Sequence, residues 1–79
     1  MNLYYFNLHN DVEVVDEEGK EFPSDGAALA YAEQAARSLV ASTIETQGSF
    51  KRHHRLDVLN ADAVLVAKVI FGDVVKVLP

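Results

Sequence analysis

The chain contains no cysteine and no tryptophan, and only two of its 79 residues are proline. Without cysteine it can form neither disulfides nor thiolate metal sites, and no cysteine nucleophile is available. This composition fits a reducing compartment, so we expect a cytoplasmic protein. The first apolar run, Leu3–Leu8, is too short for a secretory signal, and no segment approaches the length that spans a membrane.

Positive charge is also scarce, because seven Lys and Arg oppose twelve Asp and Glu, for a net charge of −5. This balance disfavours nucleic acid as a partner, since phosphate backbones attract clustered cations. The acidic residues concentrate between positions 11 and 25. The candidate basic patch, here called the basic segment, consists of Lys51, Arg52, His53, His54 and Arg55.

One long helix is predicted from Ser24 to Gln47, with Ser24 or Asp25 capping its start and Gly48 ending it. Its helical periodicity indicates an alanine-rich stripe that faces a sheet. The stripe contains Leu29, Ala32, Ala36, Leu39, Val40 and Thr43, whereas Tyr31 falls on the opposite face.

The remaining segments are typical of short strands, predicted at Leu3–His9, Val12–Val15, Arg55–Leu59 and Ala63–Phe71. In the first, Tyr4, Phe6 and Leu8 form the expected core face. The last is apolar on both faces, which indicates an interior strand. Gly19 ends an acidic loop with an expected positive φ. We therefore predict one α+β domain over residues 1–79, a ββαββ antiparallel or mixed sheet with one helix on one face.

A single helix leaves the other face of such a sheet uncovered. The apolar residues expected on that face are Leu3, Tyr5, Val64, Val66 and Ile70. A contiguous apolar patch of this kind is usually covered by a partner. We therefore expect a homo-oligomer, with a dimer as the first form, and a protein partner is a further possibility.

Four segments form a recognisable pattern: the opening Met1–Leu8, the loop Asp16–Gly19, the alanine-rich helix, and an ending that contains Phe71-Gly72-Asp73-Val74. Together they resemble a family of small bacterial proteins of unknown function. Members of that family begin Met-Pro-Arg-Tyr-Phe-Phe-His, carry Asp-x-x-Gly, and end with a hairpin followed by Phe-x-Asp-Ala. This chain has Asn2 and Leu3 in place of Pro-Arg, and Asn7 in place of His. The resemblance implies a stand-alone cytoplasmic domain and supplies no activity.

No arrangement of residues in the sequence indicates catalysis, so no catalytic, cofactor-binding or metal-binding residue is assigned. His53 and His54 are adjacent at a strand entrance, where neighbouring side chains point to opposite sides, which disfavours a shared metal. We predict a non-enzymatic interaction module that self-associates. The alternatives are weak nucleic-acid binding by an oligomer through the basic segment, and a small metal-dependent enzyme.

Overall fold

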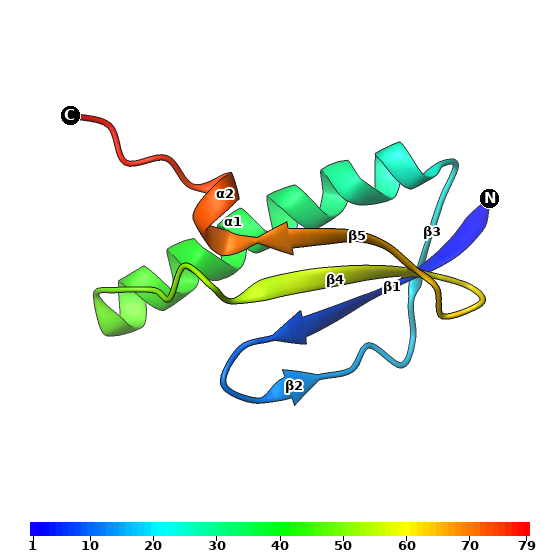
Figure 1. Cartoon of the computed structure of the whole chain (residues 1–79), viewed down its shortest axis with the longest axis horizontal. Helices are drawn as coiled ribbons and strands as arrows, with labels where there is room; N and C mark the ends of the chain where they lie inside the picture. The colour runs from blue at the N-terminus through cyan, green and yellow to red at the C-terminus, as the bar shows by residue number, and fades with distance from the viewer.

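The computed structural model describes residues 1–79 as a five-stranded sheet with one long helix across one face (Figure 1). Its elements are β1 (Asn2–His9), β2 (Glu13–Val14), β3 (Lys20–Phe22), α1 (Asp25–Gln47), β4 (Arg55–Asn60), β5 (Leu65–Ile70) and α2 (Phe71–Val74). All strand pairs are antiparallel. The α+β class with a helix on one face is therefore confirmed, and β3 and α2 are additions to the predicted ββαββ order.

The sheet runs in the order β2-β1-β4-β5, and β3 also pairs with β1. The two short strands share one edge of β1, since β3 pairs with its beginning and β2 with its end. β4 occupies the other edge of β1, so β5 has β4 as its only strand neighbour. The prediction of an interior strand at Ala63–Phe71 is therefore wrong: β5 is an edge strand, and Phe71 leaves it to begin α2.

Both ends of α1 have the predicted caps. The Ser24 hydroxyl accepts a hydrogen bond from the Ala27 amide at 3.2 Å. At the other end Gly48 adopts φ 77°, and its amide donates to the Ile44 carbonyl at 2.7 Å. Both caps satisfy backbone groups that the helix leaves without partners, which explains why these boundaries are readable from the sequence. No helix has the length and apolar character needed to cross a bilayer.

Removing the N-cap is expected to have a modest cost. Ser24→Ala should lower the free energy of unfolding by about 1 kcal/mol, because the Ala27 amide loses its acceptor. Urea unfolding followed by circular dichroism measures this loss. The control is Ser38→Ala on the exposed side of α1, which should be neutral or slightly stabilising because alanine has the higher helix propensity. Equal losses in the two variants would contradict a capping role.

The buried face of α1 consists of residues four apart: Ala28, Ala32, Ala36 and Val40. They pack against the core residues Tyr4, Leu56, Val58, Val69 and Phe71. The predicted stripe is therefore right at its alanines and wrong at its leucines, which are 37% (Leu29) and 36% (Leu39) exposed. Small side chains let the helix lie close to the sheet, and that close approach places the longer leucines at the flanks of the contact.

An aromatic cluster closes the space between the start of α1 and the sheet. Tyr31, predicted on the outer helix face, has its ring centroid 5.0 Å from that of Phe6 and 5.1 Å from that of Phe22. The Lys20 ammonium lies 4.6 Å from the Tyr31 ring centre, a favourable cation–π distance. Tyr31 therefore takes part in the packing, where its ring lies edge-on to Phe6 of β1.

Candidate functional site

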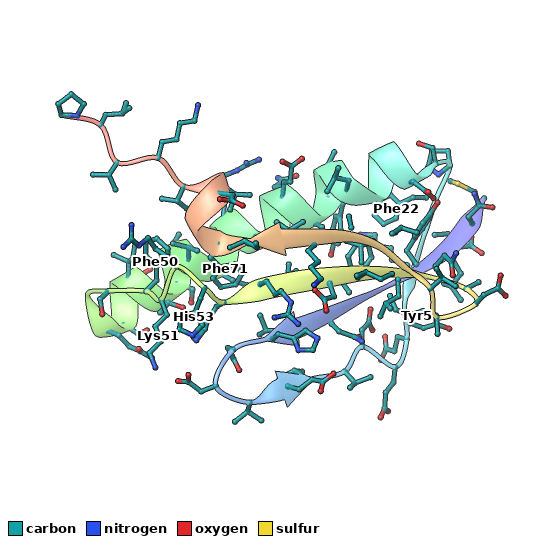
Figure 2. The ribbon with its side chains drawn as sticks, in the orientation of Figure 1. Tyr5, Phe22, Phe50, Lys51, His53 and Phe71 are labelled. Atoms are coloured by element: carbon teal, nitrogen blue, oxygen red, sulfur yellow. The ribbon has the colours of Figure 1, made fainter.

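A groove at one end of the molecule lies between the β1–β2 turn, the last turns of α1 and the loop before β4. We call it the hairpin-end groove; its volume is about 370 Å³, within the range of small-ligand sites. Figure 2 shows Phe50, Lys51, His53 and Phe71 gathered at this end. The groove is lined by Asn10, Asp11, Val12, Val14, Thr43, Gln47, Ser49, Phe50, Lys51, His54 and Phe71.

Asp11 is the charged centre of the groove. Its carboxylate accepts from the Lys51 ammonium at 3.0 and 3.1 Å, and its Oδ1 lies 3.4 Å from His54 Nε2. Lys51 first and His54 second hold the pKa of Asp11 below its usual value. Asp11 is therefore an anion at neutral pH, and its two partners come from a segment 40 and 43 residues later in the chain.

The two adjacent histidines lie on the same side of the backbone. Their ring centroids are 4.8 Å apart with the planes at 80°, so the prediction that they point to opposite sides is wrong. The alternation of a strand does not apply here, because residues 52 and 53 form a turn and β4 begins only at Arg55. His54 is held firmly: its carbonyl accepts from the Phe71 amide at 2.8 Å, and its ring packs edge-on against Phe71.

The basic segment does not form one continuous cationic surface. Lys51 and His54 face Asp11 at the groove, whereas Arg55 lies on the uncovered face of the sheet, where its Nε donates to Asp57 at 2.9 Å. Arg52 is exposed, and its backbone carbonyl accepts from the Gly72 amide at 3.0 Å. Because the nearby carboxylates neutralise much of this charge, few cations remain for a phosphate backbone.

The uncovered face of the sheet is apolar at one end and polar at the other. The strand register sets three cross-strand rows, which are Tyr5–Leu59–Leu65, Asn7–Asp57–Lys68 and His9–Arg55–Ile70. The polar middle row separates the apolar first row from Ile70, so the uncovered face carries no single apolar patch.

The five residues expected on that face therefore lie in four different environments. Leu3 and Tyr5 are half-buried on β1, and Ile70 is 37% exposed beyond the polar row. Val64 lies in the turn before β5, and Val66 packs against the core. The expectation that Val66 lies on the uncovered face is wrong, because a bulge between Val58 and Leu59 interrupts the alternation of β5.

Asp57, on the uncovered face of the sheet, is the one charged residue that is buried, and sequence reasoning did not single it out. Its two oxygens face Arg55 Nε at 2.9 Å and His9 Nε2 at 3.0 Å. Burial of a carboxylate is tolerated only with such partners. The signal available in the sequence is the spacing of Arg55 and Asp57, which places both side chains on one face of a strand.

The fold and these two regions define an α+β domain, and one family model matches its residues 3–72. The chain belongs to that family, DUF6894, described as a domain of unknown function. The resemblance to an uncharacterised family is thereby confirmed. No curated protein and no solved structure matches the chain.

Proposed function

We propose that the chain is a protein-interaction module that self-associates, with a dimer formed by pairing the β5 strands of two copies. The observation that supports this most directly is the free edge of β5, which has no strand beyond it (Figure 1). β5 contains neither proline nor glycine, and Lys68 is its only charged residue. Such an edge is a ready template for another strand.

The hydrogen-bonding pattern identifies which backbone groups would pair. The Phe71 amide donates to the His54 carbonyl, and hydrogen-bonded pairs alternate along an antiparallel ladder. His54 with Phe71 is thus a hydrogen-bonded pair. The next pair in register, Arg55 with Ile70, is a non-hydrogen-bonded pair, and so is Asp57 with Lys68. The N–H and C=O groups of Lys68 and the N–H group of Ile70 therefore point away from β4, in the direction of an added strand, whereas the Ile70 carbonyl belongs to the first turn of α2.

The opposite edge of the sheet is much less suited to self-pairing. It consists of β2 and β3, of two and three residues, joined by an acidic loop. Glu13 and Glu21 lie in these strands and Glu17 and Glu18 in the loop, so two copies would bring like charges together. A second copy is therefore expected at β5, related by a two-fold axis that makes the paired strands antiparallel.

The test is sedimentation velocity over a micromolar concentration series. The wild type should be dimeric, and Leu65→Lys should be monomeric because it adds a charge to the pairing edge. The control is Ile44→Lys on α1, since Leu65 and Ile44 are equally exposed at 44% and 43% and the charge change is the same. A monomeric wild type, or equal effects of the two variants, would contradict the proposal.

A further inference from the structure

Three potential metal ligands from two distant segments converge beside the hairpin-end groove. Asp11 belongs to the β1–β2 turn, and His53 and His54 belong to the loop before β4. One ligand atom from each lies within 4.8 Å of the other two. We propose that these three residues bind a divalent transition-metal ion, with zinc as the ion to test first. This site goes beyond the proposed self-association and shares no residue with the β5 edge.

Two of the ligands already have the spacing of a metal site. Asp11 Oδ1 lies 3.4 Å from His54 Nε2. Two ligand atoms of a tetrahedral zinc ion are separated by about 3.3 Å, given bond lengths of about 2.0 Å. His53 is exposed, so its ring is free to rotate toward the other two. Three protein ligands leave a fourth position for water or for a molecule bound in the groove.

Hydrogen bonds and packing within the fold hold two of the three ligands in position. The Asn10 side chain accepts from the Val12 amide at 2.8 Å, which shapes the turn that presents Asp11. His54 is fixed by the contacts of its backbone and ring with Phe71, as described above. Only His53 must be ordered when the ion binds. This limits the entropic cost of binding, since every side chain immobilised on binding loses rotamer freedom.

The chemistry of the ligands selects the type of ion. Two imidazoles and one carboxylate suit zinc, nickel or copper, whereas magnesium and calcium require a shell of oxygen ligands. The Lys51 ammonium is the cation that Asp11 binds in this structure, at 3.0 Å. A metal ion would compete with it for the carboxylate. Lys51 therefore weakens metal binding, and its removal should strengthen it.

Zinc titration of the full chain without an affinity tag, followed by calorimetry, tests the site. The wild type should bind one ion per chain, and Asp11→Asn and His53→Gln should each weaken binding by more than about tenfold, because even residues that only support metal ligands have effects of this size. Lys51→Met should bind more tightly than the wild type. The control is His9→Gln, which removes a histidine paired with Asp57 on the other side of the sheet and should leave zinc binding unchanged.

Amide NMR spectra provide a second readout that does not depend on the variants. Added zinc should shift the signals of residues 10–12 and 51–54 and leave that of His9 in place. The proposal is overturned if zinc binding does not saturate, if His9→Gln weakens it as much as His53→Gln, or if the shifts are spread over the acidic loop. Unchanged affinity in Lys51→Met would disprove the competition between the ammonium and the ion.

Discussion

Gly19→Ala is expected to lower the free energy of unfolding by about 2–4 kcal/mol, a large share of the roughly 4–12 kcal/mol typical of a chain this long. Gly19 adopts φ +74°, where a Cβ atom is strained. That Cβ would also lie 2.8 Å from the Tyr4 carbonyl oxygen, closer than Cβ atoms approach other heavy atoms in real structures. Relief requires movement of β1 or of the loop. Urea unfolding followed by circular dichroism measures the loss.

Gly48→Ala is a matched control for this effect. Gly48 has nearly the same φ, +77°, but a Cβ there would meet nothing within 4 Å. Its expected cost is the conformational strain alone, about 1–2 kcal/mol. The difference between the two variants therefore reports the contact with β1. Equal losses at both positions would show that the close approach of the loop to Tyr4 contributes nothing.

Asp16→Ala is expected to lower the free energy of unfolding by about 2–3 kcal/mol, because one carboxylate satisfies three backbone amides. Asp16 accepts from the Phe6, Glu18 and Gly19 amides, each at 3.1 Å. The Phe6 amide lies between the residues of β1 that pair with β3 and those that pair with β2. Asp16 thus takes the place of a strand partner there, and its removal leaves that amide without an acceptor.

The acid dependence of stability distinguishes this role from simple packing. Burial opposes ionisation of Asp16, but the three amide hydrogen bonds outweigh it and lower its pKa below the ordinary 3.8. The resulting stabilisation is complete above that ordinary value and is lost as the pH falls through the lowered pKa of the folded state. The difference in stability between wild type and Asp16→Ala should therefore shrink in acid.

Chemical denaturation at a series of pH values from neutral to acid measures that difference. The control is Glu17→Ala in the same loop, which is exposed and should change stability by no more than about 0.5 kcal/mol at any pH. A pH-independent difference between wild type and Asp16→Ala would contradict the assignment.

The features predicted correctly from sequence depend on neighbouring residues. Ser24 caps the start of α1 and Gly48 its end, through hydrogen bonds to residues three and four positions away. The positive φ of Gly19 is likewise set within its own loop. The orientation of α1 about its axis depends instead on contacts with the sheet, whose strands are distant in the sequence. Hydrophobicity alone places Leu29 and Leu39 in the core, whereas the alanines are buried because the sheet comes close to the helix.

The candidate site could not be predicted for a related reason. Asp11 and Lys51 are 40 residues apart, and no periodicity links a hairpin turn to a loop so distant in the chain. The histidine pair was visible as a motif, but its geometry depends on where β4 begins. A strand one or two residues longer would have separated the rings. The edge position of β5 likewise follows from the pairing of β1 with β4, which sequence patterns did not reveal.

The central position of β1 has a consequence for how the molecule folds. β1 pairs with β4 from Tyr4–Asn60 to His9–Arg55, across most of the chain. During synthesis, only the hairpins with β2 and β3 and the helix α1 can form before residues 55–60 exist. Closing this long loop makes the topology slow to fold compared with a helical domain of the same length. β1 thus acquires its longest partner only after the whole of α1 has been synthesised.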